Sequence, residues 1–328
     1  MGMVAFQEIE DAARRIRPHI RRTPVDLSTS LSDMTGVPVY LKLEHRQITG
    51  AFKVRGATNA VLSLSDAERA RGVVAASTGN HGRGLAHAAK RAGIRCVVCM
   101  SSLVPQVKID AIKALGAEIR IVGKSQDEAQ MEVGRLIREE RLVSVPPFDH
   151  PLIVAGQGTI GLEIVEDVPD VSTVFVPLSG GGLISGVAAA VKAKRPGVKV
   201  VGISMARGAA MHASLKAGYP TEVEELPTLA DSLGGGINLD NSITFEMVRT
   251  LVDRVVLLTE AEIAAGIRHA YVQEREVIEG GAAVGVAALL ARKVKSFGPT
   301  VLLLTGRSID MRLHQSVVAG TNALMDAA

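Results

Sequence analysis

The residues best suited to chemistry begin with a run of three glycines. An apolar, β-branched stretch that is typical of a strand precedes Gly180, Gly181 and Gly182. A predicted helix begins at Gly182 and continues through Leu183. Consecutive glycines leave their backbone N–H groups uncovered, and the N-terminus of a helix adds positive potential. The run therefore predicts a site that holds a phosphate group.

A dinucleotide-binding fingerprint is the alternative interpretation of this loop. That fingerprint requires a glycine at the sixth position of G-x-G-x-x-G, where this chain has Ser185. It also requires an acidic residue at the end of the next strand, where Ser204 stands. A terminal phosphate on a smaller cofactor therefore fits the loop better than a dinucleotide does.

Lys53 is the second candidate for chemistry. It stands at the start of an otherwise apolar helical stretch, shortly after Thr49 and Gly50. Burial lowers the pKa of a lysine, and a neutral amine can form a Schiff base with a carbonyl group. A lysine of this kind and a phosphate site in one chain together indicate pyridoxal phosphate.

The third candidate is the loop at residues 77–82, which has the sequence STGNHG. It follows a predicted strand and opens a predicted helix, and ligands of α/β folds bind at the carboxyl ends of strands. The loop offers hydroxyls, an amide, an imidazole and free backbone N–H groups. The alternative is a capped helix start with flexible glycines.

The composition excludes several classes of protein. A chain of 328 residues, 47% of them hydrophobic and 22% charged, is long and apolar enough for roughly two folded domains. The formal net charge is only +3, and 6 Phe, 3 Tyr and no Trp leave few rings to stack on bases, so nucleic-acid binding is not expected. The most basic stretch, residues 14–22, is interpreted as a solvated helix face or a subunit contact.

The sequence also argues against a membrane segment, a signal peptide and a zinc site. The first ten residues include acids, and the apolar runs elsewhere are short. Cys96 and Cys99 spell C-x-x-C, but they stand in an apolar run typical of a strand, where residues three apart point to opposite faces. With no second cysteine pair and no disulfide framework, we expect buried cysteines and a cytoplasmic protein.

The elements that must position these candidates alternate along the chain. Strands are predicted at residues 39–43, 72–76, 96–100, 118–122, 142–145, 173–177, 198–203, 255–258 and 300–304. Helices are predicted at residues 51–64, 80–92, 105–115, 125–141, 159–166, 182–194, 260–274 and 282–297. Such alternation predicts an α/β fold whose mostly parallel strands are covered by helices on both faces. Pro146 and Pro147 mark a boundary between two α/β units.

The motifs, taken in order, resemble the threonine dehydratase and serine racemase family, which are pyridoxal phosphate enzymes like the β subunit of tryptophan synthase. The matching motifs are KLE at 42–44, TGAFK at 49–53, STGNHG at 77–82 and SGGGLISG at 179–186, and the likeness covers nearly the whole chain. Within the family, KLEHRQ at 42–47 and LADSLGGGI at 229–237 most resemble the hydroxyectoine utilization dehydratase branch.

The resemblance implies an architecture. It consists of two open, mostly parallel twisted sheets with helices on both faces. A large domain would comprise residues 1–48 and 148–328, and a small domain residues 49–147. The cofactor would lie in the cleft between the two domains.

The resemblance also implies roles around the cofactor. Lys53 would carry the Schiff base and act as the base at the substrate Cα, with Phe52 packed beside it. Asn80 would hydrogen-bond the pyridoxal 3′-oxygen, and Thr305 would face the pyridine nitrogen. A hydroxyl at that nitrogen leaves the ring without a full proton, which suits rapid β-elimination. The phosphate would be bound by backbone N–H groups of Gly180, Gly181, Gly182 and Leu183, with Gly236 beside the cofactor.

The substrate carboxylate would be held by the third loop, through Ser77, Thr78, Asn80 and His81. Thr78 stands where racemases of the family carry a serine that acts as acid and base on the ring face opposite the lysine. We therefore expect the enzyme to catalyse elimination much faster than racemisation.

Other departures from the family pattern concern Ala51, the metal site and two arginines. Ala51 replaces a usual serine. Ser204 and Ala210 stand where metal-binding members carry acids, so no metal site is expected. Arg83 replaces a common glutamine and Arg307 a common glycine. The two arginines are either surface or supporting residues, or they extend the substrate preference toward an additional polar or anionic group.

The resulting expectation is a cytoplasmic, homodimeric, pyridoxal-phosphate-dependent dehydratase. Its partner is a small hydroxy-amino-acid substrate from which it removes water by β-elimination, and hydroxyectoine catabolism is the expected context. The alternatives are a serine/threonine ammonia-lyase and a hydroxyaspartate dehydratase. A binding protein without catalysis would require the loss of Lys53 or of the glycine loop, and both are intact.

Overall fold

The structure is a computed structural model that describes residues 3–77, 79–104 and 106–326. Its larger sheet has six strands, which in spatial order are β1 (Val25–Leu27), β2 (Val39–Lys42), β10 (Thr300–Leu303), β7 (Thr173–Pro177), β8 (Lys199–Met205) and β9 (Arg254–Leu258). Its smaller sheet has four, in the order β5 (Glu118–Ile121), β4 (Cys96–Met100), β3 (Val73–Ala76) and β6 (Val143–Ser144). Every described pairing is parallel except that of β1 with β2.

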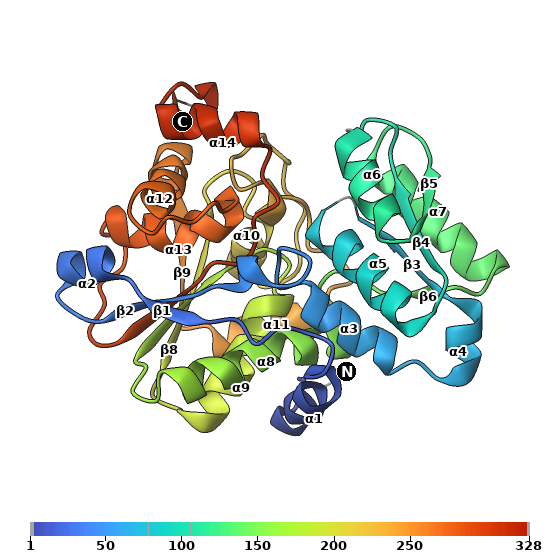
Figure 1. The fold of residues 1–328 in the computed structure, drawn as a ribbon, viewed down its shortest axis with the longest axis horizontal. Helices are drawn as coiled ribbons and strands as arrows, with labels where there is room; N and C mark the ends of the chain where they lie inside the picture. The colour runs from blue at the N-terminus through green and yellow to red at the C-terminus, as the bar shows by residue number, and fades with distance from the viewer. Residues whose placement is uncertain (1–2, 78, 105, 327–328) are drawn as a thin grey trace.

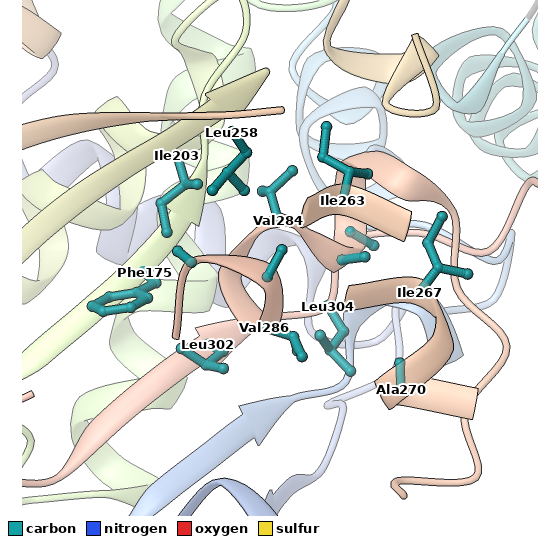
Figure 2. Close-up of a cluster of buried hydrophobic side chains, with 14 of the residues drawn as sticks. Phe175, Ile203, Leu258, Ile263, Ile267, Ala270, Val284, Val286, Leu302 and Leu304 are labelled. Atoms are coloured by element: carbon teal, nitrogen blue, oxygen red, sulfur yellow. The ribbon is translucent and has the colours of Figure 1, made fainter. Parts of the chain in front are cut away.

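Helices cover both faces of the six-stranded sheet. One face packs against α8 (Pro151–Asp167) and α9 (Gly182–Lys194), and the other against α12 (Glu260–Val272) and α13 (Gly280–Leu290). The strand residues alternate accordingly, because Val174 lies in the core on the α8 and α9 side and its neighbour Phe175 in the opposite core. Figure 2 shows Phe175 in that second core, beside the valines of α13.

The four-stranded sheet is sandwiched in the same way. Its one face packs against α3 (Val54–Leu62), α5 (Asn80–Ala92) and α6 (Gln106–Ala114), and its other face against α7 (Gln126–Glu139). Cys96 faces the first core and Cys99 the second, and both are buried and free, as predicted. Burial raises the thiol pKa of both, to about 12 for Cys96, which leaves them inert at neutral pH.

The two sheets with their helices stand side by side in Figure 1, and the fold class is confirmed as α/β with two mostly parallel sheets. Helix α3 packs against both α5 and α8, so it joins the two halves. All four strands of the smaller sheet lie within the predicted small domain, but the exact domain boundaries remain a prediction. Among the described residues, no helix combines the length and apolarity that crossing a membrane requires.

Several elements were not predicted from the sequence. They are α1 (Phe6–Ile16), β1, α2 (Thr29–Thr35), η1 (Glu44–Arg46), α4 (Asp66–Arg71), α10 (Ala210–Ala217), η2 (Asp231–Leu233), α11 (Thr244–Leu251), α14 (Met311–Ala319) and η3 (Ala323–Asp326). In α1 the buried residues Ile9, Ala12 and Ile16 recur at helical spacing, a pattern that the charged residues around them obscure.

Two predicted helix boundaries were wrong. Helix α8 begins eight residues earlier than predicted, because the His150 side chain accepts a hydrogen bond from the Leu152 N–H and Pro151 occupies the first turn. Helix α13 ends at Leu290 rather than at residue 297, since Arg292 adopts a left-handed φ of 52°. Helix α7 starts where the sequence predicts a helix, with Ser125 as its N-cap residue and Ser125 and Glu128 forming a capping box.

The sheet order brings the candidate residues together. Strands β2, β10 and β7 are parallel neighbours, so their carboxyl ends lie at one edge of the sheet. The chain leaving β2 leads to Lys53, the chain leaving β10 to Thr305, and the chain leaving β7 to the glycine loop. This is the edge at which open α/β sheets bind ligands.

Candidate active site

The glycine loop connects β7 to α9 in a conformation that only glycine adopts without strain. Gly181 is the N-cap of α9 and has a φ of 86°. A Cβ on Gly180 would lie 2.4 Å from a ring carbon of Phe148, so no side chain fits there. Within the described part of the chain, the backbone N–H groups of Gly181, Gly182 and Leu183 have no partner, as expected for the first turn of a helix. The loop thus offers bare donors to an anion.

The glycine loop is held in place by the first residue of α11. The Thr244 hydroxyl donates a 2.7 Å hydrogen bond to the Gly180 carbonyl oxygen. The Asp149 carboxylate in turn accepts from the backbone N–H groups of Ile243 and Thr244, at 3.0 and 2.8 Å. These contacts fix the loop before any ligand binds.

Lys53 lies in a turn directly after Ala51, which forms an isolated β-bridge with Gly306 beyond the end of β10. The Phe52 N–H donates to the Thr305 carbonyl oxygen at 3.0 Å, and the Arg307 N–H donates to the Gly50 carbonyl oxygen at 3.0 Å. Gly50 has a φ of 81°, which a glycine accommodates readily. Lys53 is therefore fixed beside Thr305, immediately before α3 begins.

Lys53 is half-buried as a residue, and its amine donates a 2.8 Å hydrogen bond to the Pro147 carbonyl oxygen. Its Nζ lies 5.3 Å from the centroid of the Phe52 ring. Burial lowers the pKa of Lys53 to about 8, and the negative charge of Glu279 opposes that shift. About a tenth of the amine is therefore neutral, and so nucleophilic, at pH 7.

Two adjacent residues, Pro147 and Phe148, connect Lys53 to the glycine loop. Pro147, the acceptor for Lys53, precedes Phe148, whose ring lies against Gly180 and whose backbone lies against Gly182. The sequence placed these features more than a hundred residues apart, and the structure brings them together. An amine and an anion cradle that contact the same two-residue segment are placed to bind the two ends of one small cofactor.

The amide of Asn80 is oriented from both ends. Its Oδ1 accepts a 2.7 Å hydrogen bond from the Ser308 hydroxyl, and its Nδ2 donates a 2.8 Å hydrogen bond to Glu279 Oε1. An amide nitrogen carries two hydrogens, so one remains to donate to a ligand. Asn80 thus has the spare donor that its predicted role requires.

Glu279 is the site residue that sequence reasoning missed. It is 3% exposed, occupies the N-cap position of α13 without a capping bond from its side chain, and also accepts a 2.8 Å hydrogen bond from the Ser308 N–H. Burial raises the pKa of its carboxyl, although the hydrogen bonds from Asn80 and Ser308 act in the opposite direction. The available signal was an acidic residue directly before Gly280 and Gly281, at the start of a helix without other charges.

The loop at 77–82 is only partly described, because Thr78 lies outside the described residues. The Ser77 hydroxyl accepts a 3.1 Å hydrogen bond from the Gly82 N–H. The His81 ring is buried and bonds the Val145 carbonyl oxygen at 2.7 Å, and burial together with the charge of Lys53 lowers its pKa to about 3. A contribution of His81 to carboxylate binding would therefore come from its backbone N–H rather than from its ring.

The remaining predicted residues differ in how deeply they are buried. Leu183 and Thr305 are buried, at the start of α9 and beyond the end of β10. Gly236 is exposed in the segment between η2 and α11, and its role beside the cofactor stays a prediction. Arg83 is half-buried on α5, and Arg307 is exposed. No cluster of three or more His, Cys, Asp or Glu side chains suited to a metal ion occurs in the described ranges.

Comparisons with known proteins agree with this geometry. The profile of the family described as pyridoxal-phosphate dependent enzymes matches residues 16–306. A relative from Sinorhizobium fredii, provisionally named a threonine dehydratase, is 59% identical over 321 residues, which cover 98% of this chain and 97% of the relative. L-threonine ammonia-lyase of Thermotoga maritima is 42% identical over 316 residues, covering 96% of this chain and 78% of that protein.

A solved structure is similarly close. That of maize serine racemase superposes with a TM-score of 0.91 and is 32% identical, covering 97% of this chain and 98% of the other. The residues in the site fit the cofactor of such enzymes. The glycine loop is a cradle that a Cβ would fill, Lys53 supplies a partly neutral amine, and Asn80 keeps one donor free.

Proposed function

The chain belongs to the pyridoxal-phosphate dependent enzyme family, and on that premise we propose that it removes water from a 3-hydroxy amino acid by β-elimination. It is a pyridoxal-phosphate-dependent lyase, in line with the relatives named as threonine dehydratase and threonine ammonia-lyase. The observation that carries the proposal is the Lys53 amine, with a pKa of about 8, next to an uncovered anion cradle.

The roles of the residues follow from their positions. When bound, pyridoxal phosphate supplies an electron sink that makes the Cα proton of an amino acid removable. We assign the cofactor phosphate to the N–H groups of the glycine loop and its 3′-oxygen to the Asn80 amide. Lys53 would hold the cofactor at rest, and its Nζ would accept the Cα proton of the substrate.

The substrate carboxylate is assigned to the loop at 77–82, where the N-terminus of α5 presents backbone donors. The reaction removes the Cα proton and the Cβ hydroxyl, which together make up one water molecule. The released enamine then hydrolyses to a 2-keto acid and ammonia. Because Thr78 replaces the racemase serine, elimination is proposed to exceed racemisation.

The identity of the substrate is a more specific part of the proposal. The resemblance of residues 42–47 and 229–237 to the hydroxyectoine branch supports a substrate derived from that osmolyte. Opening the hydroxyectoine ring gives a 3-hydroxy-2,4-diamino acid, which carries the hydroxyl that β-elimination requires. The likeness to L-threonine ammonia-lyase supports the alternative of a serine/threonine ammonia-lyase, and a hydroxyaspartate dehydratase is the other alternative.

We further propose that the enzyme acts as a homodimer in the cytoplasm, as expected from the family and from its two free, buried cysteines. The cofactor and substrate would meet in the cleft between the large domain (1–48 and 148–328) and the small domain (49–147).

A substrate panel tests the proposal. Purified holoenzyme is incubated with serine, threonine, 3-hydroxyaspartate and 2,4-diamino-3-hydroxybutyrate, and keto acid, ammonia and the opposite enantiomer are quantified. The proposal predicts keto acid and ammonia in equal amounts from at least one substrate, with far less enantiomer. Racemisation as the main reaction, or no elimination from any of them, would contradict it.

A further inference from the structure

Arg83 and Arg307 lie beside the site. In the described part of the chain they lack carboxylate partners, unlike the deeply buried Arg55. Arg55, which is fully buried, bonds both Glu44 and Glu163. Arg83 is half-buried, and its Nε is enclosed without a partner among the described residues. No described carboxylate forms an ion pair with Arg83 or with Arg307. Their charge is thus left for a ligand or for solvent.

Both arginines border residues that position Asn80 and Lys53. The Arg83 guanidinium donates a 3.1 Å hydrogen bond to the Ser308 hydroxyl, which in turn donates to Asn80. Arg307 is the neighbour of Ser308 in the chain, and its side chain crosses Gly50, where a Cβ would lie 3.3 Å from the arginine Nε. The Arg83 guanidinium therefore lies beside the Ser308–Asn80 pair, and the Arg307 side chain lies beside the segment that leads to Lys53.

The nearby carboxylate does not neutralise them. Glu279 accepts hydrogen bonds from Asn80 Nδ2 and from the Ser308 N–H, whereas Arg83 reaches only the Ser308 hydroxyl. Lys53 adds a further positive group when it is protonated. Asp231 adds a second carboxyl close to Glu279, but no described hydrogen bond or ion pair joins it to either arginine. Arg83, Arg307 and a protonated Lys53 thus stand against two carboxyls, and this excess of positive charge favours an oxygen acceptor or an anion.

We propose that Arg83 and Arg307 form a subsite for an oxygen-bearing group attached to the β-carbon of the substrate, either a second carboxylate or an acyl oxygen. This inference rests on the proposed dehydratase function and adds the substrate class. The α-carboxylate is already assigned to the loop at 77–82, so the arginines serve a second group. An ammonium at that place is disfavoured, so a 3-hydroxy-2,4-diamino acid binds with its 4-amino group acylated.

The test compares substrates that differ only at the β-substituent. Threonine carries a methyl group, 3-hydroxyaspartate a carboxylate and 3-hydroxyasparagine a neutral amide, all with the same configuration. For the holoenzyme we expect kcat/KM for 3-hydroxyaspartate to exceed that for threonine by about tenfold or more, with the amide between them. For the diamino substrate, the N4-acetylated form should exceed the free form. The reverse order in both pairs would overturn the subsite.

Variants separate direct binding from support of Asn80. Arg83→Ala and Arg307→Ala should each lower the ratio of 3-hydroxyaspartate to threonine kcat/KM by about tenfold. Arg83→Lys, which keeps the charge but not the planar fork, should lower it less. Arg91→Ala, an exposed position on the same helix, is the matched control and should leave the ratio unchanged. An equal loss for every substrate would show that Arg83 only supports Ser308, and would overturn the proposal.

Binding measurements keep the subsite and the proposed function apart. Calorimetric titration of the holoenzyme with succinate and with its monoamide succinamate needs no turnover. Succinate should bind about tenfold tighter, and Arg83→Ala should remove that difference. If no substrate is dehydrated but succinate is preferred, the dehydratase function fails and the anion subsite stands. If both acids bind equally and Arg83→Ala weakens neither, the subsite fails whatever the activity.

Discussion

Lys53 and Pro147 are joined by a 2.8 Å hydrogen bond from the lysine Nζ to the proline carbonyl oxygen. Because Phe148 follows Pro147 and packs on Gly180, this bond connects the amine to the glycine loop through two adjacent residues. A neutral carbonyl as partner leaves the ammonium less compensated than a carboxylate would. Burial lowers the pKa of Lys53, and only the charge of Glu279 acts in the opposite direction.

The first prediction concerns the pH dependence of cofactor incorporation. The pKa of Lys53 falls from 10.5 to about 8, so the amine is protonated below about pH 8 and neutral above it. The rate at which the cofactor-free protein takes up pyridoxal phosphate should rise about tenfold per pH unit below pH 8 and level off above it. Stopped-flow absorbance of the imine measures this rate, and a rise that continues to pH 10 would show an unperturbed lysine.

The second prediction concerns Glu279, whose charge raises the pKa of Lys53 against the effect of burial. Glu279→Gln removes that charge, so the inflection of the same pH profile should move to lower pH. Glu246→Gln removes an exposed carboxylate of α11 and is the matched control, with an unchanged inflection. An inflection that stays in place in Glu279→Gln would mean that the carboxyl is neutral in the folded protein.

The third prediction concerns the phosphate cradle. Gly181→Asp introduces a side chain at a φ of 86° and a negative charge among the donors, so affinity for pyridoxal phosphate should fall by about tenfold or more. Gly197→Asp is the matched control, because Gly197 is exposed and a Cβ there would meet nothing within 4 Å. Equilibrium titration of both cofactor-free variants measures the affinities. Equal affinities would mean that the phosphate binds elsewhere.

The fourth prediction concerns the buried ion cluster that Arg55 forms with Glu44 and Glu163. Arg55 stands two residues after Lys53 and bonds Glu44 and Glu163. Arg55→Ala leaves Glu44 without its ion-pair partner and Glu163 with Lys42 alone, so the free energy of unfolding should fall by about 3–5 kcal/mol. Arg95→Ala removes an exposed arginine that pairs with Glu118 and Glu140, and should cost about 1 kcal/mol or less. Urea unfolding of both variants compares these losses, and similar losses would contradict a structural role for the cluster.

Much of the fold could be predicted from the sequence because local signals coincide with the element ends. Helix α5 and strand β4 match their predicted bounds to the residue, since Gly93 ends the helix in a left-handed conformation and Arg95 precedes an unbroken apolar run. Strand β7 and helix α9 also match, because the glycine run separates them.

The parts of the site that the sequence could not provide depend on contacts between distant segments. Ser308 and Glu279 lie 228 and 199 residues from Asn80 along the chain, yet both bond its amide. No local pattern marks Ser308, whose hydroxyl matters only because β10 ends beside the start of α5. The ring of His81 shows the converse, because its type indicated a ligand-binding role whereas the fold directs it to a buried carbonyl.

The most direct test of the account is to locate the covalent bond between protein and cofactor. Holoenzyme is reduced with borohydride, digested, and mapped by mass spectrometry, with Lys53→Ala treated in parallel. We predict loss of the visible imine absorption on reduction, a pyridoxyl-phosphate adduct on Lys53, and neither the imine nor elimination activity in the variant. An adduct on any other lysine, or full activity of Lys53→Ala, would contradict the account.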